Sequence, residues 1–143
     1  MAEMRERLER LGFEILDDPR EKLVDRIGSV VLEWVNMTQD RPRLSTLLSD
    51  KMACDYSLLS KSFTEVKGMT IEQYMKLLRV ERVKEELCYG ERSIAEISYL
   101  LGFSSPAHLS TQFKSVTGLS PRAFQLREKD AKMNNGRKSL DMI

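Results

Sequence analysis

Residues 58–70 read LLSKSFTEVKGMT, and residues 108–120 read HLSTQFKSVTGLS. At a spacing of 50 residues the two stretches share a leucine, a serine, a phenylalanine, a valine and a glycine, and each ends in an apolar residue and a hydroxyl residue. Each pattern fits an amphipathic helix that the glycine ends, with a hydroxyl group to cap the next helix. A short apolar helix and a tight turn precede each copy, as in a helix-turn-helix unit. The duplication therefore indicates a protein that contacts DNA.

The composition allows a folded protein with a modest attraction for DNA. With 143 residues, 41% of them hydrophobic, the chain can bury one compact core or two small cores that share an element. The net charge is +1, and it is unevenly spread: residues 1–44 carry 8 basic against 10 acidic side chains, and residues 45–143 carry 15 against 12. Phosphate neutralisation supplies most non-specific DNA affinity. We therefore expect DNA binding to be weak in a monomer, or to depend on helix N-termini and dimerisation.

The sequence contains no arrangement typical of an enzyme or a metal protein. Cys54, Cys88 and His108 lack the spacing of a zinc site, and we find no glycine-rich phosphate loop or nucleophile elbow. We predict no catalytic, cofactor or metal site. No apolar run approaches the ~20 residues of a membrane span, and the first residues are charged, unlike a secretory signal. We expect a cytoplasmic protein without a membrane partner.

Capping residues predict where the first long helix begins. Asp18 can accept the unpaired N–H groups of a helix start, and Pro19 fits the first turn. Apolar residues then recur at helical spacing and are expected to face a core: Leu23, Ile27, Val30, Val31 and Trp34. Polar residues 36–43 form a connector.

The same reasoning predicts an all-α fold with six further helices. The longest, about 18 residues opened by Thr70 and ending near Cys88, is ~27 Å long and carries one apolar stripe in its first half and a nearly opposite stripe in its second half. We expect it to pack one half on each helix-turn-helix unit and so to join them. The other helices are expected over residues 45–52, 56–67, 94–101, 107–116 and about 120–126.

These elements divide the chain into four segments. Residues 1–20, with a short helix over 3–11 and a brief strand over 13–16, are interpreted as an N-terminal arm or as the remnant of a truncated domain. The other three segments are a first unit with the joining helix over 21–88, a second unit over 89–127, and a disordered tail over 128–143.

Three stretches together resemble the signature of the AraC/XylS family of bacterial transcription regulators: IAEISYLLGF over residues 94–103, SPAHLSTQFK over 105–114 and TGLSP over 117–121. The resemblance extends over about residues 23–126. It implies a seven-helix DNA-binding domain with two recognition helices in successive major-groove segments, and RNA polymerase as a second partner. The alternative hypothesis is a helical protein-interaction module that kept this fold without reading DNA productively.

The resemblance also implies which residues face DNA. On the first recognition helix Leu58, Leu59 and Phe63 are expected to point toward the core. On the second, the sequence departs from the family pattern, because His108–Leu109 stands where an aromatic pair is common and Thr111 stands where arginine is frequent. For Ser57 and Ser60 an ordinary solvated surface remains an alternative, as does a capping or packing role for His108. The predicted groove-facing residues are Ser57, Ser60, Lys61, Ser105, Ala107, His108 and Thr111.

Phosphate contacts are expected from helix starts and from basic side chains. The N–H groups of helices that open at Ser45, Ser93 and Ser105 can bind phosphate oxygens. The basic side chains predicted to assist them are Arg79, Arg82, Arg92 and Lys114.

Overall fold

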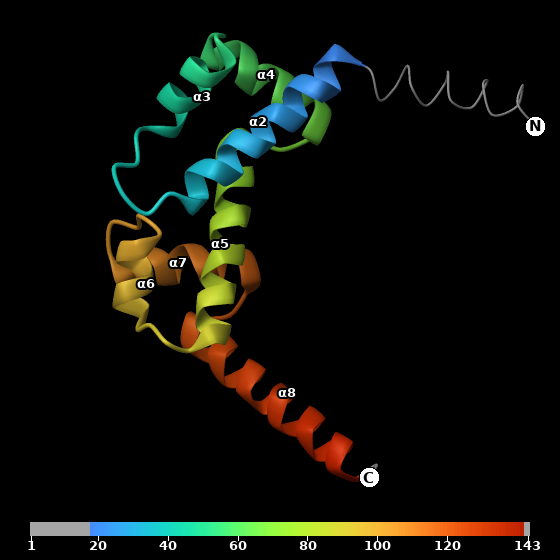
Figure 1. Ribbon diagram of the computed structural model, residues 1–143, viewed down its shortest axis with the longest axis vertical. Helices are drawn as coiled ribbons and strands as arrows, with labels where there is room; N and C mark the ends of the chain where they lie inside the picture. The colour runs from blue at the N-terminus through green and yellow to red at the C-terminus, as the bar shows by residue number, and fades with distance from the viewer. Residues whose placement is uncertain (1–17, 142–143) are drawn as a thin grey trace, which may run out of the picture. The chain divides into compact units, whose positions relative to one another are not determined.

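The computed structural model describes the backbone of residues 18–141, and the side chains of residues 18–133. Within the described range, the regular structure is entirely helical, which confirms the predicted all-α fold (Figure 1). The helix expected over residues 3–11 and the strand over 13–16 lie outside the described residues. The helices are α2 (Pro19–Asn36), α3 (Leu44–Met52), α4 (Tyr56–Lys67), α5 (Ile71–Tyr89), α6 (Ile94–Leu100), α7 (Pro106–Thr117) and α8 (Pro121–Asp141).

The capping chemistry largely follows the sequence prediction. The Asp18 carboxylate accepts the Arg20 N–H at 2.9 Å at the start of α2. The glycines Gly68 and Gly118 end α4 and α7 with φ of 73° and 82°, a left-handed conformation that side chains disfavour. The prediction that α3 opens at Ser45 is wrong. This helix begins one residue earlier, at Leu44, after an Arg43 cap that makes no side-chain hydrogen bond.

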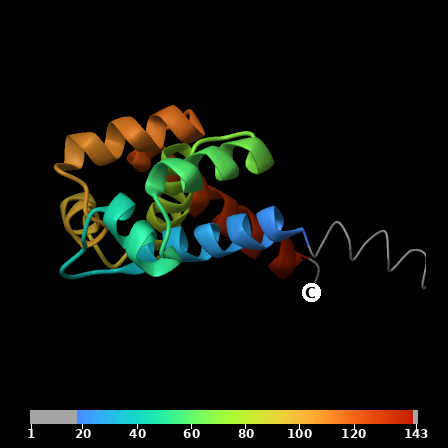
Figure 2. The ribbon, with the colours of Figure 1, turned by 90° about the horizontal axis from the view of Figure 1, so that it is seen from above.

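The first compact unit ends at Met75. In it, α2 packs against α3 and α4, and the two views of Figures 1 and 2 show these helices side by side. Trp34, predicted to lie in the core, is only half-buried, and its indole N–H donates to the Pro42 carbonyl at 2.7 Å. The fully buried hydrophobic side chains of this unit are Val24, Ile27, Val31, Val35, Leu48, Leu59, Phe63 and Ile71.

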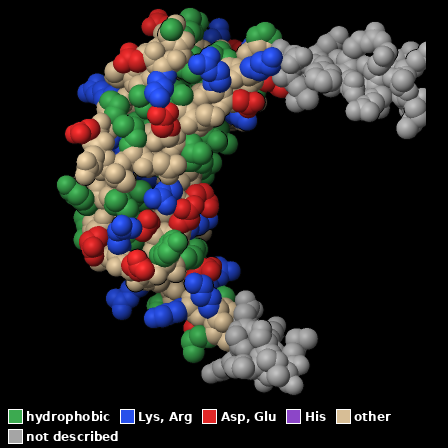
Figure 3. All heavy atoms as spheres, viewed as in Figure 1, with side chains coloured by type: hydrophobic (Ala, Val, Ile, Leu, Met, Phe, Trp, Pro, Cys, Tyr) green, Lys and Arg blue, Asp and Glu red, His purple; other side chains and the backbone are tan. Residues whose placement is uncertain are grey.

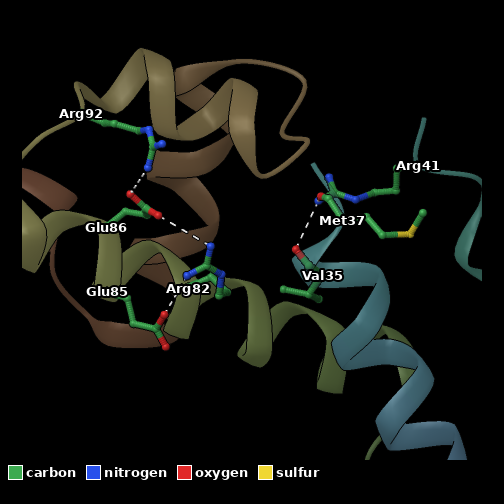
Figure 4. Close-up of polar contacts among 7 residues, drawn as sticks. All are labelled: Val35, Met37, Arg41, Arg82, Glu85, Glu86 and Arg92. Carbon is green, nitrogen blue, oxygen red and sulfur yellow. Dashed lines mark hydrogen bonds and ion pairs between the residues drawn. The ribbon is translucent and has the colours of Figure 1, made fainter. Parts of the chain in front are cut away.

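Arg41 fixes the end of α2 in a way that the sequence analysis did not predict. Its guanidinium donates to the carbonyl of Val35 at 3.2 Å and to that of Met37 (Figure 4). It also donates to the carbonyl of Trp34 at 3.1 Å. The same group lies 4.8 Å from the centroid of the Trp34 ring. One cation thus binds carbonyl groups at the end of α2, where the Trp34 carbonyl also accepts the Met37 N–H.

The second compact unit begins at Lys76, so the boundary falls inside α5 and not after residue 88. The physical reason is that the second half of α5 contributes Val80, Val83 and Leu87 to the second core. Phe124 of α8 packs against this core, with its ring centroid 5.4 Å from that of Phe113. The rest of the core consists of Ile97, Leu101, Phe103, Leu109 and Phe113.

The chain remains helical to Asp141, whereas the sequence analysis expected a disordered tail from residue 128. Residues 122–133 consist mainly of strong helix formers and contain no proline. Contacts with the end of α5 add to this tendency: the Gln125 amide donates to the Leu87 carbonyl at 3.3 Å, and the Lys132 amine donates to the Cys88 carbonyl at 3.5 Å.

Truncation of either repeat phenylalanine is expected to destabilise its unit. Phe63 and Phe113 are fully buried, so replacement by alanine removes buried surface and leaves a cavity, at a cost of about 3–5 kcal/mol in the free energy of unfolding. Urea unfolding followed by circular dichroism measures this loss. The control, Leu126→Ala, removes a side chain that is 56% exposed and should change stability by no more than about 0.5 kcal/mol. Equal losses in all three variants would contradict the assignment of the cores.

Candidate nucleic-acid interface

The outer face of α4 is determined by its buried face. Leu59 and Phe63, four residues apart, are both fully buried, which turns the opposite side of the helix to solvent. Ser57, Lys61 and Thr64 lie on that opposite side and are all exposed. The predicted DNA-facing residues Ser57 and Lys61 thus share one accessible surface, to which the sequence analysis did not assign Thr64.

This surface of α4 contains a shallow depression, whose lining also includes the half-buried Ser60 together with Tyr56 and Glu65. The Tyr56 hydroxyl donates to the Glu72 carboxylate at 2.6 Å. Burial first, and then this hydrogen bond and the negative charge of Glu72, raise the pKa of Tyr56 far above its ordinary value. The phenol therefore stays neutral. Glu65 is ion-paired with Arg20 of α2.

The outer face of α7 is equivalent to that of α4. Leu109 and Phe113 are fully buried, and Ala107, Thr111 and Lys114 are exposed. At the 50-residue spacing, Ala107 corresponds to Ser57, Thr111 to Lys61 and Lys114 to Thr64. Each face therefore carries one lysine, but on different turns. The sequence signal that could have identified Thr64 was its correspondence with Lys114.

The prediction that Leu58 points toward the core is wrong, because this side chain is 59% exposed. One residue corresponds to a rotation of about 100° on a helix, so Leu58 cannot share the inner face fully with Leu59. At the equivalent position of α7, His108 packs edge-on against the Phe103 ring, with 5.4 Å between ring centroids. The first turn offers Ala53 and Cys54 instead, without an aromatic side chain.

His108 and Ser105 form hydrogen bonds within the second turn, which connects α6 to α7. The Ser105 hydroxyl oxygen accepts the His108 backbone N–H at 3.0 Å and so caps α7. The Ser104 backbone N–H donates to Nδ1 of His108 at 3.3 Å, and the Ser104 hydroxyl lies 3.1 Å from the same atom. An N–H donor at Nδ1 requires a lone pair there, so the neutral ring carries its proton on Nε2. The capping and packing alternative for His108 therefore has direct structural support.

Arg79 was predicted to contact phosphate, but its position does not fit that role. The side chain belongs to the buried side of α5, and the residue is only 5% exposed. Its guanidinium lies 4.1 Å from the centroid of the Phe103 ring and donates to the Gly102 carbonyl at 3.3 Å. Arg79 thus holds the second turn against α5, and it would have to leave the core to contact DNA.

Arg82 and Arg92, also predicted phosphate contacts, are held by carboxylates (Figure 4). Glu86, which is 8% exposed, accepts from Arg92 at 2.8 Å and lies 3.6 Å from a guanidinium nitrogen of Arg82. Arg82 also donates to Glu85 at 2.7 Å. A phosphate would therefore have to compete with ion pairs already formed within the protein.

Side chains of the protein itself already form hydrogen bonds at the start of α6. Ser93 and Glu96 form a reciprocal capping box, with both bonds at 3.1 Å. The backbone N–H of Ser93 chiefly, with the serine hydroxyl and the charge of Arg92, lowers the pKa of Glu96. A carboxylate thus already takes the place at this helix start that the sequence analysis assigned to a phosphate.

Positive charge is not gathered into one field on the face drawn in Figure 3, where basic and acidic side chains alternate. Among the described residues, no group of three or more histidine, cysteine or acidic side chains is arranged to hold a metal ion. None of the helices in the described range has the length and apolar character needed to cross a bilayer. The accessible cations of the two outer faces are Lys61 and Lys114.

The helix-turn-helix domain family matches residues 48–127, which is more than half of the chain and includes α4, the whole of α5, α6 and α7. The chain belongs to the AraC/XylS family of transcription regulators. Among curated relatives, the HTH-type transcriptional activator RhaS of Yersinia pestis (strain Pestoides F) is 32% identical over 92 residues, or 64% of this chain and 34% of RhaS. RhaS of Yersinia pseudotuberculosis serotype O:1b (strain IP 31758) matches equally. This AraC/XylS chain thus spans about a third of the length of the curated relatives that it matches.

Solved structures share the AraC/XylS fold. The C-terminal domain of AraT, a response regulator from Geobacillus stearothermophilus, has a TM-score of 0.64 and 20% identity over 73% of this chain and 84% of that one. The DNA-binding domain of the global transcriptional factor AdpA, solved in complex with a target DNA, has a TM-score of 0.64 and 20% identity over 76% and 94%. At this identity the likeness establishes the fold.

In this AraC/XylS family member, neutralising Glu86 is expected to destabilise the second unit. Glu86→Gln removes the charge that pairs with Arg92 and Arg82, the latter 25% exposed, and should lower the free energy of unfolding by about 1–3 kcal/mol. Glu81→Gln is the matched control on the same helix, because the Glu81 side chain is 62% exposed whereas that of Glu86 is 10% exposed. The control should change stability by no more than about 0.5 kcal/mol. Similar urea midpoints for the two variants would show that the Glu86 cluster does not stabilise the fold.

Proposed function

We propose that this chain is a sequence-specific DNA-binding transcription regulator that contacts promoter DNA through the outer faces of α4 and α7. The observation that carries the proposal is the equivalence of the two faces, each on the second helix of a helix-turn-helix unit and each accessible in its own unit. The second helix of such a unit is the one that enters the major groove. AdpA, whose DNA-binding domain shares the fold, was solved with a target DNA, and RhaS is named a transcriptional activator.

Two equivalent readers favour two successive segments of the major groove. Major-groove segments one helical turn apart are separated by about 34 Å. A chain with two readers would engage two such segments of one duplex.

The side chains on the outer faces of α4 and α7 indicate that the two helices make different kinds of contact with DNA. Lys61 can donate to guanine O6 and N7, and the hydroxyls of Ser57, Ser60 and Thr64 can pair with several base edges. On α7, Ala107 and Thr111 present small groups, and Lys114 is suited to phosphate. We infer that α4 contributes more of the sequence discrimination and that α7 contributes more to positioning.

We further propose RNA polymerase and a second copy of the chain as partners. Family membership supports the first. The weak net charge supports the second, because two linked readers gain affinity without new contacts.

Replacement of Lys61 should weaken DNA binding without unfolding the protein. Lys61→Ala removes an exposed cation, so the slope of log affinity against log salt should fall by about 1 if the amine contacts phosphate. A base contact would instead reduce discrimination at one position by about 1–3 kcal/mol. Fluorescence anisotropy over a salt series, with duplexes selected from random DNA, measures both effects. The melting temperature should stay unchanged.

Lys51→Ala is the matched control, since Lys51 belongs to the same unit but its amine is 2.8 Å from Glu33. This variant should bind DNA as the parent chain does. If the parent chain selects no duplex and shows no affinity at low salt, the proposal fails and the protein-interaction module is the better account.

A further inference from the structure

The two compact units bury hydrophobic side chains to a similar extent but differ in the polarity of their interiors. Among the described residues, the first unit buries nine hydrophobic side chains and the second buries eight. The buried polar and charged residues of the described range all belong to the second unit: Arg79, Glu86, Ser98 and Gln112. Burial of a polar group costs free energy of hydration, which a hydrogen bond within the protein offsets. The hydrogen bonding of these four residues therefore bears on the relative stability of the two units.

Three of the four residues make hydrogen bonds inside the second unit, and Gln112 is the exception. Arg79 donates to a backbone carbonyl, and Glu86 accepts from an arginine. The Ser98 hydroxyl donates to the Ala95 carbonyl at 2.8 Å. Gln112 is only 7% exposed, and its amide oxygen is buried without a hydrogen-bond partner. Its desolvation is therefore not offset within the fold.

The first unit has no such group at the equivalent position. Fifty residues before Gln112 stands Ser62 on α4, which is half-buried. Within residues 18–75 no side-chain nitrogen or oxygen is buried without a hydrogen-bond partner. Native proteins satisfy nearly all of their buried polar groups, so an unsatisfied one requires an explanation. Here the unsatisfied amide separates two units that the repeat otherwise makes alike.

We propose that the buried amide of Gln112 lowers the stability of the second unit, so that this unit opens and closes while the first unit stays folded. Parts of one protein open with different free energies, in cooperative groups that often coincide with supersecondary motifs. An unpaired buried group favours opening of the unit that contains it, because water pairs with the group once the unit is open. The second helix-turn-helix unit is therefore the part of the chain that opens more often.

The difference in stability makes the two units act in order, a consequence that rests on the proposed DNA-binding function. The first unit presents α4 in a persistent fold, whereas the outer face of α7 exists only while the second unit is closed. A duplex that contacts α7 favours the closed form by mass action. DNA that the first unit has already bound thus stabilises the fold of the second.

Amide hydrogen exchange of the 143-residue chain, followed by NMR, tests the stability difference without DNA. The readouts are the amides of equivalent buried residues, Leu59 and Phe63 in the first unit and Leu109 and Phe113 in the second. In the parent chain the second pair should be about tenfold less protected than the first. Gln112→Met removes the amide and keeps the length of the side chain, so it should raise protection of the second pair about tenfold. The first pair should not change.

Ser62→Met is the matched control, because it places the same new side chain at the equivalent position of α4. It should leave exchange in the second unit as it is in the parent. Gln112→Leu, a second hydrophobic replacement, should act in the same direction as Gln112→Met. Equal protection of the two units in the parent overturns the proposal. Protection of the second unit that is unchanged or lowered in both Gln112 variants overturns it as well.

Addition of a duplex selected from random DNA tests the coupling to DNA binding. The difference in protection between the two units should disappear in the complex, and a difference that persists overturns the ordered action of the units. A parent chain that selects no duplex overturns the proposed function. In that case the exchange measurements without DNA still decide whether the second unit is the less stable one.

Discussion

The burial of one leucine and one phenylalanine in each repeat is the constraint on which the rest of the structure depends. Leu59 with Phe63, and Leu109 with Phe113, are fully buried, and side chains four residues apart share a helix face. Each pair therefore fixes the rotation of its helix about its own axis. Once that rotation is fixed, the outward residues follow, and the repeat makes them equivalent in α4 and α7. The outer faces of α4 and α7 are in this sense a consequence of the core.

Electrostatics limit what these surfaces can do. Three of the arginines best placed by sequence to bind phosphate are engaged within the second unit: Arg79 by Phe103 and Gly102, and Arg82 and Arg92 by Glu85 and Glu86. The charge left for DNA comes from few side chains, so the contribution of counterion release to affinity should be small. Under the proposed function, sequence discrimination depends on side chains of the two outer faces that can contact base edges.

The sequence predicted the helices well because their start and end signals are local. Ser93 with Glu96, Ser105 with Pro106, and the two glycines Gly68 and Gly118 act within one turn of chain. The predicted family and fold class are confirmed. Ser57, Lys61, Ala107 and Thr111, which the family resemblance placed on the outer faces, are all exposed.

Features that depend on tertiary packing were not predicted. The predicted core face of α4 included Leu58, although the repeat places Ala53 where Phe103 stands in the second unit. The burial of Arg79 depends on the same ring, and the helical path of residues 128–141 depends partly on contacts of α8 with the end of α5. Each of these outcomes is decided by a residue distant in sequence.

The central claim is that two equivalent helix faces read the major groove of one duplex. Methylation interference tests it most directly, because dimethyl sulfate modifies guanine N7 in the major groove and adenine N3 in the minor groove. The account predicts interference by guanine methylation in two clusters about 10 base pairs apart, the spacing of successive major-groove segments. A single cluster, or interference confined to adenine, would contradict it.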